Sequence, residues 1–276
     1  MDLITNNIKQ KIQNLILENL FKKNINETEK GIAEVLDILY ENIPDNKRIS
    51  YGAYYIIKVL SKFIYEGLGN KKELVYQSLE HVLELNRDYR VSCVCLGILS
   101  WYANENSTYI KKIVPFFKVS AIDEDWKMRE TSAGFFHSMI KHHPEIMKSY
   151  LQIFSTDLNP KLRRFASETL RPVAENRWIQ KKPDYSLSIL RGMFTESSAY
   201  PRTSVGNNLS DLARKNPDLI YDIVKDLVQS GNKNSYWIAY RACRNLVKKE
   251  PIKVMDLLLV DEYKYKKNRY KRIDYI

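Results

Sequence analysis

An aromatic ring and a carboxylate, Trp126 and Glu130, stand four residues apart near the middle of the chain. On a helix this spacing places both side chains on one face, one turn apart. The face of an indole attracts cations and a carboxylate supplies a negative charge, so the pair can hold a positively charged group. The alternative is structural, with Trp126 packed against a preceding helix pair and Glu130 paired with Arg164.

The residues around this pair predict a helix with two distinct faces over residues 126–141. At 100° per residue the apolar side chains fall on one broad stripe. The stripe contains Met128, Phe135, Phe136, Met139 and Ile140. Trp126, Glu130, His137 and Lys141 lie together off the stripe, and we therefore expect them outside the core.

A repeat of 34 to 39 residues surrounds this helix. Each unit begins at a basic or tyrosine anchor that opens an amphipathic run. The anchors are Tyr51, Arg90, Arg129, Arg163, Arg202 and Tyr236. Three anchors are followed by proline fifteen residues later, at Pro144, Pro217 and Pro251. Each interval is long enough for two helices and their turns, as in stacked helical repeats.

The second helix of a unit is predicted at residues 145–154, 185–194 and 218–228. Proline near a helix start and an acid in the first turn both suit an N-terminus. Paired helices that cannot bury their apolar stripes alone must stack on neighbouring pairs. We therefore predict an all-α fold, a right-handed α-solenoid of HEAT-like helical repeats with a concave basic face.

The predicted organisation is a single HEAT-like repeat domain over residues 1–276. Residues 1–50 form capping helices, 51–260 form the repeats, and 261–276 form a basic aromatic tail. Tyrosine rings that alternate with Lys and Arg in this tail can stack on nucleic acid and meet phosphates. The alternative for the tail is a frayed, solubilising end.

The next two units predict a continuous row of polar side chains. After Asn159, the expected apolar side is Leu162, Ala166, Leu170 and Val173, and the expected polar side is Arg164, Glu168, Arg171 and Glu175. In the following unit Val205, Leu209 and Leu212 point inward, while Asn207, Asp211 and Arg214 form the polar side. These positions recur at the same offsets from their anchors, so stacking joins them into one groove.

The charge of the chain indicates an anionic partner. Forty-four Lys and Arg stand against 33 Asp and Glu, a formal net charge of +11. Seven of the basic residues fall within residues 161–182. Such a cluster can follow a phosphate backbone with steep salt dependence. The alternative is a solvated helix face with internal Glu–Arg pairs.

Several other classes of protein receive no support from the sequence. Cys93, Cys95 and Cys243 are too few for a disulfide framework and fit the core of a protein in a reducing compartment. There is no secretory signal and no apolar run of membrane-spanning length. We therefore expect a cytoplasmic protein of the prokaryotic cytosol or nucleoid, with no membrane partner, and a monomer.

No cofactor or metal is expected. His137, His142 and His143 lack paired cysteines or a His-Glu-x-x-His frame, and they fit a helix C-terminus that favours positive charge. A glycine-rich phosphate loop is also missing from the sequence.

Three blocks in the middle third of the chain resemble the AlkC/AlkD-like DNA alkylation repair proteins. They are residues 125–130 (Asp-Trp-Lys-Met-Arg-Glu), residues 163–172 (Arg-Arg-Phe-Ala-Ser-Glu-Thr-Leu-Arg-Pro) with Trp178, and residues 199–211 with Lys-Asn-Pro-Asp at 215–218. The resemblance implies a HEAT-like horseshoe that holds duplex DNA. In active members it implies hydrolysis of the N-glycosidic bond of a cationic alkylated purine, of the 3-methyladenine or 7-methylguanine type.

The resemblance also implies roles for particular residues. Glu130 and Trp126 are the implied catalytic pair, because a carboxylate stabilises an oxocarbenium-like sugar and an indole favours a cationic base. The implied DNA-binding residues are Arg163, Arg164, Arg171, Trp178, Arg202, Asn207, Asn208 and Asp211. Two alternatives remain open: a non-catalytic binder of damaged or branched DNA, and a protein-interaction scaffold.

Overall fold

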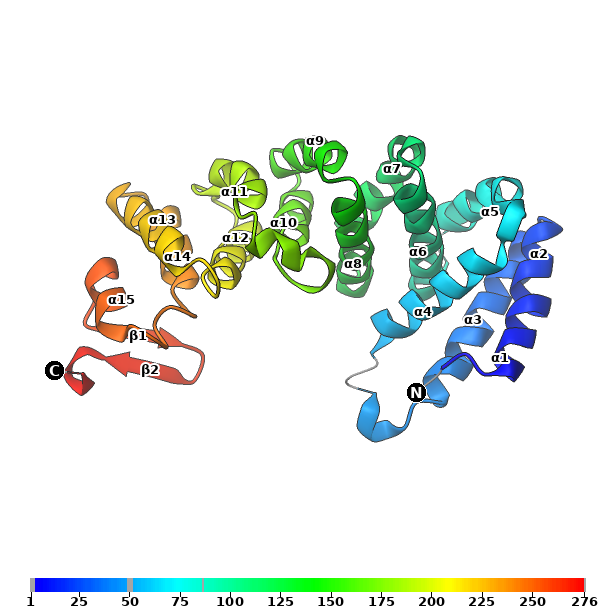
Figure 1. Cartoon of the computed structure of the whole chain (residues 1–276), viewed down its shortest axis with the longest axis horizontal. Helices are drawn as coiled ribbons and strands as arrows, with labels where there is room; N and C mark the ends of the chain where they lie inside the picture. Colours follow the sequence, from blue (N-terminus) through cyan, green and yellow to red (C-terminus); the bar gives the residue numbers. More distant parts are fainter. Residues whose placement is uncertain (1–2, 49–51, 86, 276) are drawn as a thin grey trace. The chain divides into compact units, whose positions relative to one another are not determined.

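The computed structural model describes residues 3–48, 52–85 and 87–275. Over these residues the chain is helical apart from one short hairpin (Figure 1), which confirms the predicted all-α fold of helical repeats. The chain divides into two compact units, Met1–His142 and His143–Ile276, which we call unit 1 and unit 2. Within the described residues, none of the helices combines the length and apolar character needed to cross a membrane.

Unit 1 consists of paired helices in two layers. Its elements are α1 Asn6–Lys11, η1 Ile12–Leu17, α2 Glu18–Phe21, α3 Ile25–Glu41, η2 Asp45–Lys47, α4 Ala53–Gly67, η3 Gly69–Lys71, α5 Lys72–Leu85, α6 Tyr89–Glu105, η4 Ser107–Tyr109, α7 Ile110–Ile122 and α8 Trp126–His142. Helices α4, α6 and α8 pack side by side as one layer, and α5 and α7 pack on α6 and α8 as the other. The stripe predicted for residues 126–141 is buried, and the Phe136 ring meets Phe117 edge-on at 5.4 Å. The expectation that His137 lies outside the core is wrong, because its side chain is also buried.

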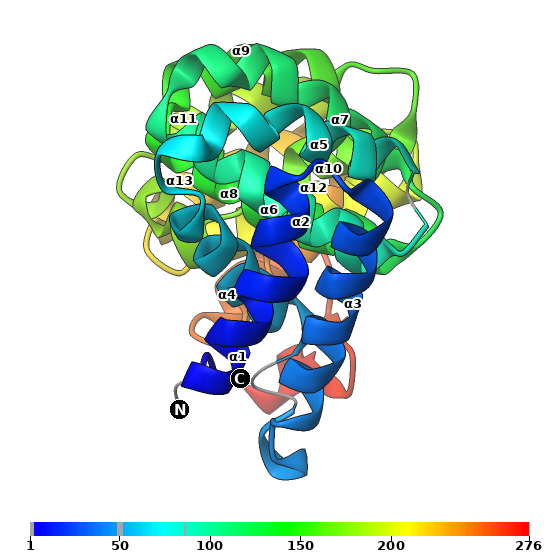
Figure 2. The same cartoon turned by 90° about the vertical axis from the view of Figure 1, so that its right-hand side faces the viewer.

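The N-terminal helices form a pair of their own. Segments α1, η1 and α2 run on as one helix with a wide middle turn, and this helix lies beside α3 (Figure 2). Ile12 and Ile16 on the first helix and Val35 and Leu39 on α3 are buried. Burial of a stripe on each partner is what holds two such helices together.

Unit 2 repeats the two-layer arrangement and ends in a hairpin. Its elements are α9 Pro144–Ser155, α10 Pro160–Thr169, η5 Ala174–Gln180, α11 Asp184–Leu190, η6 Arg191–Met193, α12 Ala199–Leu212, α13 Pro217–Gln229, α14 Lys233–Ala242, α15 Pro251–Leu258, β1 Glu262–Tyr265, β2 Asn268–Lys271 and η7 Arg272–Asp274. Helices α10, α12 and α14 pack side by side. The three second helices predicted from proline and acid correspond to α9, α11 with η6, and α13.

One helix is shorter in the structure than the sequence predicts. Helix α10 ends at Thr169, so Arg171, Val173 and Glu175 do not continue its faces. Pro172 is the reason, because it lacks an N–H and disfavours helical backbone in the residue before it. Arg214 likewise follows the end of α12 at Leu212.

The loop that leads into α8 is closed by four local hydrogen bonds. The Asp123 carboxylate accepts from the backbone N–H of Asp125 at 2.7 Å, and Asp125 in turn accepts from the N–H of Lys127 at 2.9 Å. Arg129 Nη1 donates back to the carbonyl oxygens of Asp123 at 2.6 Å and Glu124 at 2.9 Å. We call this arrangement the loop clamp. It fixes the backbone on which the first turn of α8 begins.

The same loop clamp precedes α10. Asp157 accepts from Asn159 N–H at 2.9 Å, Asn159 accepts from Lys161 N–H at 2.9 Å, and Arg163 Nη1 donates to the Asp157 and Leu158 carbonyls at 2.9 Å. Two of the predicted anchors, 34 residues apart, are therefore the arginines of equivalent clamps.

The other anchors depart from this arrangement to different degrees. Before α12, Arg202 Nη1 donates to the Ser197 carbonyl at 3.1 Å, five residues back, as in the clamp. Arg90 instead lies in the first turn of α6, where it pairs with the N-cap residue Asp88 at 2.8 Å. The anchor Tyr51 falls outside the described residues.

The predicted C-terminal tail is folded rather than frayed. Strands β1 and β2 form an antiparallel hairpin in which Tyr263 faces Tyr270. Tyr263 is fully buried, and its ring stacks on Tyr240 of α14 at 4.4 Å. The alternation of tyrosine with lysine is therefore the period-two pattern of a strand with one packed face.

Candidate functional site

A pocket of about 780 Å³ opens over the first turns of α4, α6 and α8 in unit 1. Its lining is mainly aromatic and charged: Tyr40, Arg48, Gly52, Ala53, Tyr54, Tyr55, Tyr89, Arg90, Trp126, Lys127, Glu130 and Thr131. The catalytic pair implied by the resemblance, Trp126 and Glu130, meets in this one pocket. Its volume lies in the range of ordinary ligand sites.

Trp126 and Glu130 project from the first two turns of α8, directly after the loop clamp. The Trp126 side chain is 61% exposed, although burial of an indole is favourable. Glu130 is also exposed and lines the same pocket. An aromatic face and a carboxylate are therefore presented together from a backbone that hydrogen bonds hold in place.

The tyrosines of the pocket come from parts of the chain far from α8. Tyr54, on α4, packs against Phe135 with ring centroids 5.6 Å apart. Gly134 makes room for it, since a Cβ there would lie 2.4 Å from the Tyr54 ring. Tyr40, from α3, and Tyr55 are exposed at the pocket. Sequence reasoning missed these residues.

The arginines that line the pocket are engaged by their own aspartates. Arg90 pairs with Asp37 at 2.5 Å and with Asp88 at 2.8 Å, and the hydrogen bonds that it donates to Asp88 contribute most to its raised pKa. Arg48 pairs with Asp45 at 2.7 Å. These pairs neutralise much of the positive charge in the wall. The pocket therefore combines aromatic faces with the Glu130 carboxylate, an arrangement that favours a flat, cationic ligand.

Two of the arginines predicted to bind DNA in unit 2, Arg163 and Arg171, form ion pairs between repeats. Arg163 binds both oxygens of Glu196, at 2.7 and 2.9 Å, and Arg171 bridges Glu168 at 2.5 Å and Asp211 at 2.6 Å. Their guanidinium groups join neighbouring helices.

Asn208 and Asp211 also join helices. Asn208 is fully buried and donates to the Ser167 carbonyl of α10 at 3.1 Å. Asp211 is 2% exposed and accepts from Arg171 and from Arg244, the latter at 3.3 Å. Both residues belong to α12 and lie beneath the surface. They connect α12 to α10 and to the segments that follow α10 and α14.

Arg164, Arg202, Asn207 and Trp178 are only partly buried. The Arg164 guanidinium lies 4.6 Å from the centroid of the Tyr200 ring, and that of Arg202 lies 5.1 Å from the Trp237 ring. Asn207 accepts hydrogen bonds from two further arginines. Trp178 is separate from this group, since it packs edge-on against Tyr185 at 4.9 Å.

The two arginines bound to Asn207 were missed in the sequence. Arg241 donates to Asn207 Oδ1 at 2.8 Å and Arg244 donates to it at 2.7 Å. Burial lowers the pKa of Arg241, and the charges of Arg244 and Arg171 lower it further. Arg241 follows Asn207 by 34 residues, so extending the polar row by one unit would have found it. Unit 2 thus concentrates arginine on α10, α12 and α14.

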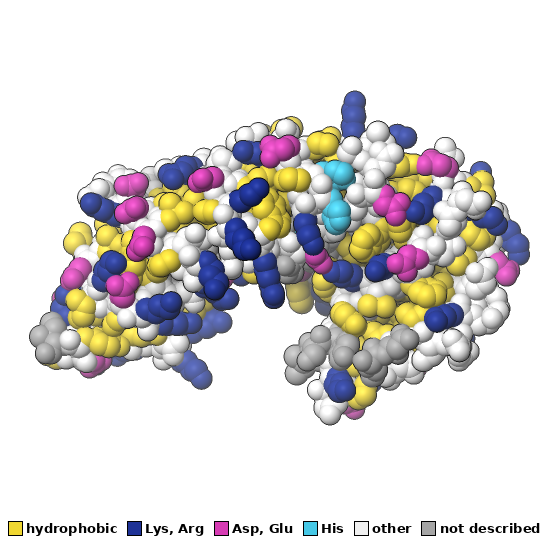
Figure 3. All heavy atoms as spheres, in the orientation of Figure 1, with side chains coloured by type: hydrophobic (Ala, Val, Ile, Leu, Met, Phe, Trp, Pro, Cys, Tyr) yellow, Lys and Arg dark blue, Asp and Glu magenta, His cyan; other side chains and the backbone are white. Residues whose placement is uncertain are grey.

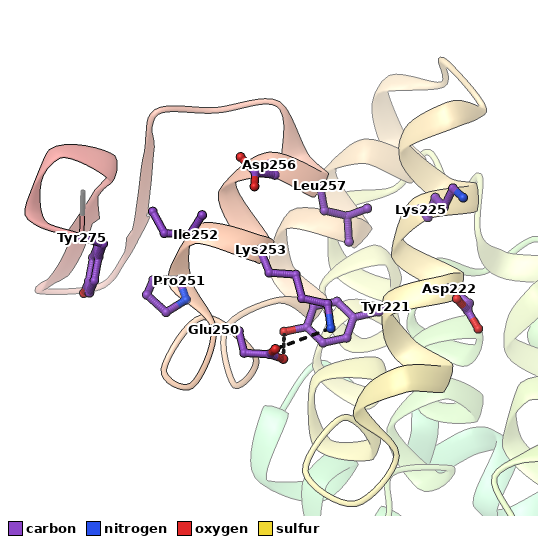
Figure 4. Close-up of a pocket in the computed structure, with 10 residues that line it drawn as sticks. All are labelled: Tyr221, Asp222, Lys225, Glu250, Pro251, Ile252, Lys253, Asp256, Leu257 and Tyr275. Atoms are coloured by element: carbon purple, nitrogen blue, oxygen red, sulfur yellow. Dashed lines mark hydrogen bonds and ion pairs between the residues drawn. The ribbon is translucent and has the colours of Figure 1, made fainter.

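A second pocket, of about 870 Å³, lies between α13 and α15 in unit 2 (Figure 4). Its polar groups bind one another: the Tyr221 hydroxyl donates to Glu250 at 2.8 Å, and Lys253 Nζ lies 3.9 Å from the Tyr221 ring centroid. Pro251, Ile252 and Leu257 make much of the remaining wall. Its lining includes the exposed carboxylates Asp222, Glu250 and Asp256 but no tryptophan, unlike the pocket in unit 1.

Two sequence expectations concern sites for ions. Over the described ranges no group of three His, Cys, Asp or Glu is placed to hold a metal ion. His142 Nδ1 lies 2.8 Å from the Ser138 carbonyl at the end of α8, in the predicted capping position. The three cysteines are buried, and burial raises the pKa of each thiol.

Comparison with known proteins identifies the fold. No family model matches the chain. Over 111 residues it is 32% identical to the uncharacterized protein YhaZ of Bacillus subtilis. This match covers 38% of this chain and only 30% of the length of YhaZ. Among solved structures it is similar to AlkD2 from Streptococcus mutans, with a TM-score of 0.59 and 18% identity over 81% of this chain and 98% of that one.

A second solved structure is equally similar. It is the alkylpurine DNA glycosylase AlkC of Pseudomonas fluorescens, solved bound to DNA containing an abasic site analog, with a TM-score of 0.58 and 19% identity over 88% of this chain and 68% of that one. The chain has the AlkC/AlkD-like fold. The resemblance read from the middle third of the sequence is confirmed at the level of the fold.

Proposed function

We propose that the protein binds duplex DNA in alkylation repair, as a DNA N-glycosylase that removes cationic alkylated purines. The observation that carries the proposal is the pocket in unit 1, where Trp126 and Glu130 stand one helical turn apart among tyrosine rings. The likeness in fold to a DNA-bound alkylpurine glycosylase supports the same class of substrate.

The chemistry suits this pair. A purine alkylated at N3 or N7 carries a positive charge and is already a good leaving group. Trp126 holds the cationic base against its indole face. As the C1′–N bond breaks, its electron pair leaves with the base and positive charge develops on the sugar. Glu130 stabilises that charge and orients the water that adds to C1′. The water loses a proton to the carboxylate or to solvent.

Unit 2 supplies contacts to the DNA backbone in this proposal. Arg164, Arg202, Arg241 and Arg244 carry positive charge on the α10, α12 and α14 side, and Asn207 orients the last two. The more buried residues Arg163, Arg171, Asn208 and Asp211 act by holding the repeats in register. Trp178, which packs against Tyr185, remains a DNA-contacting residue in the proposal.

The deciding experiment measures purine release from methylated duplex DNA by the full chain and by Glu130→Gln. Loss of one group that stabilises developing charge typically lowers a rate by about 100-fold or more. Glu84→Gln is the matched control, because Glu84 is an exposed acid on α5 outside the pocket. Release by Glu130→Gln at the parent rate would overturn the catalytic role.

Binding measured on the same samples separates the alternatives. Duplex binding without purine release from the parent protein would select the non-catalytic binder of damaged or branched DNA. Absence of both activities would leave the protein-interaction scaffold.

A further inference from the structure

The C-terminal hairpin has one packed face and one charged face. Tyr263, Tyr265 and their partners Asn268 and Tyr270 share the first face. The other face carries a single acid and three bases, and two lysines form the turn. These charged residues are Glu262, Lys264, Lys266, Lys267, Arg269 and Lys271. Figure 3 shows Lys and Arg side chains gathered around this hairpin.

This arrangement costs stability in two places. Lys264 stands directly opposite Arg269, and like charges across a strand pair are destabilising, although Arg269 also binds both carboxylate oxygens of Glu262. Lys266, in the turn, has φ of +54°, a left-handed conformation that glycine adopts far more easily than a residue with a side chain. Strained or repelling groups that a fold retains are candidates for function.

The hairpin is nevertheless held firmly to α14. The Tyr263 hydroxyl donates to the Tyr240 carbonyl at 2.8 Å, and Tyr240 accepts from the Lys264 N–H at 2.7 Å. Arg272 then ties the end of the hairpin to Asp256 at 2.6 Å. The basic face is therefore presented by a rigid base and does not belong to a loose tail.

Tyr265 joins the hairpin to the arginines of unit 2. Its ring has three cations within 6 Å of its centroid: Lys266 at 5.8 Å, Arg244 at 5.8 Å and Arg241 at 5.9 Å. Burial raises the pKa of the Tyr265 hydroxyl, but the hydrogen bond from Arg244 and these charges outweigh it and lower the pKa. The positive surface on α14 thus continues onto the hairpin.

We propose that the hairpin is a second DNA contact, in which Lys266 and Lys267 at the turn bind backbone phosphates of the duplex outside the lesion pocket. The proposal rests on the proposed function. Charge complementarity selects the partner, since the outward face of both strands carries charged side chains and no apolar ones. A phosphate backbone needs only cations, whereas insertion into a membrane surface also needs apolar side chains, and the exposed ones nearby, Leu259 and Ile273, lie outside the two strands.

The test is the salt dependence of binding to an unmodified duplex of about 20 base pairs, with the full chain and the double variant Lys266→Gly with Lys267→Gln. Each lost phosphate contact lowers the slope of log affinity against log salt by about 1. We therefore expect the slope to fall by about 2 and the affinity at low salt to fall roughly tenfold. Lys266→Gly alone should raise the melting temperature, because glycine accepts the left-handed turn.

The matched control is Lys23→Gly in unit 1. Lys23 is an exposed lysine with φ of +57°, so this change removes the same charge and relieves the same backbone strain. It should raise the melting temperature while leaving affinity and slope as in the parent.

Each outcome decides one point. If the parent binds the duplex and the double variant binds with the same slope, the hairpin contact is wrong and the proposed function stands. If the parent does not bind duplex at all, the proposed function itself fails. If the double variant loses the parent's binding to anionic phosphatidylserine vesicles but keeps its duplex binding, the hairpin proposal is overturned in favour of a lipid surface.

Discussion

The first turns of α8 and α10 begin after the same loop clamp but carry different side chains. Position for position, Trp126 corresponds to Pro160 and Glu130 to Arg164, 34 residues apart. In unit 1 the result is an aromatic pocket with a carboxylate. In unit 2 it is a row of arginines held by Glu168, Asn207 and Asp211. The comparison shows that the same clamp can precede helices whose first two turns present different side chains to the surface.

The largest expected effect is on the free energy of unfolding, when the ion pairs that hold the arginines of unit 2 are removed. Asp211→Ala removes the buried carboxylate that Arg171 and Arg244 share, and Arg171 is left with Glu168 alone. Removal of one member of a buried ion pair costs about 3–5 kcal/mol. Urea unfolding measures the loss, with Asp226→Ala, an exposed acid on α13, as the control. A cost near that of the control would mean that Asp211 does not hold α10 to α12 and α14.

Exchange of the first-turn residues tests the comparison directly. Glu130→Arg places the side chain of α10 in the pocket of α8, and we expect purine release to fall by at least about 100-fold with duplex affinity retained. The reverse change, Arg164→Glu, should instead weaken duplex binding and reduce its salt slope. Equal effects of both changes on release would contradict the division of roles between the units.

A smaller effect is expected from the glycine beneath Tyr54. Gly134→Ala places a methyl group 2.4 Å from the Tyr54 ring, so the ring must move out of the pocket wall. Overpacking of this kind costs about 1–3 kcal/mol. Gly192→Ala is the control, since a Cβ there has no atom within 4 Å. Thermal unfolding together with purine release would show whether stability and pocket shape change together.

The smallest effect concerns pH. Burial opposes ionisation of Glu168, but the charges of Arg171 and Arg164 and a hydrogen bond from Ser204 prevail and lower its pKa from 4.5. A lowered pKa in the folded state adds stability above about pH 4.5, and this stability is lost as the pH falls through the folded value. The stability gap between the parent and Glu168→Gln, measured by urea unfolding, should therefore shrink below pH 4.5. A constant gap from pH 7 to pH 3 would rule out this linkage.

Local patterns predicted much of the helical framework. The second helices were placed within a few residues because proline and an acid mark their starts, and the buried stripe of α8 followed from its period. The over-long α10 arose where an apolar period, continued through Leu170 and Val173, outweighed the stop signal of Pro172. The hairpin was missed although Tyr263 and Tyr265 alternate with lysines.

The candidate site was only half visible in the sequence. Trp126 and Glu130 share one helix, and their spacing together with the resemblance to the repair proteins was enough to pair them. Tyr40, Tyr54 and Tyr89 reach the same pocket from other helices, and no local pattern connects them. Helical periodicity also placed Asp211 among exposed polar residues. A buried carboxylate needs partners from other elements, here Arg171 and Arg244, and those pairings exist only after packing.

The loop clamp has a consequence for how such a chain can diversify. All of its hydrogen bonds join groups within seven consecutive residues, so the starts of α8 and α10 are specified locally, although Arg163 also binds Glu196 of the next repeat. Side chains in the following turn can then be exchanged while the backbone path stays unchanged. A scaffold of this kind can acquire a new binding preference one repeat at a time.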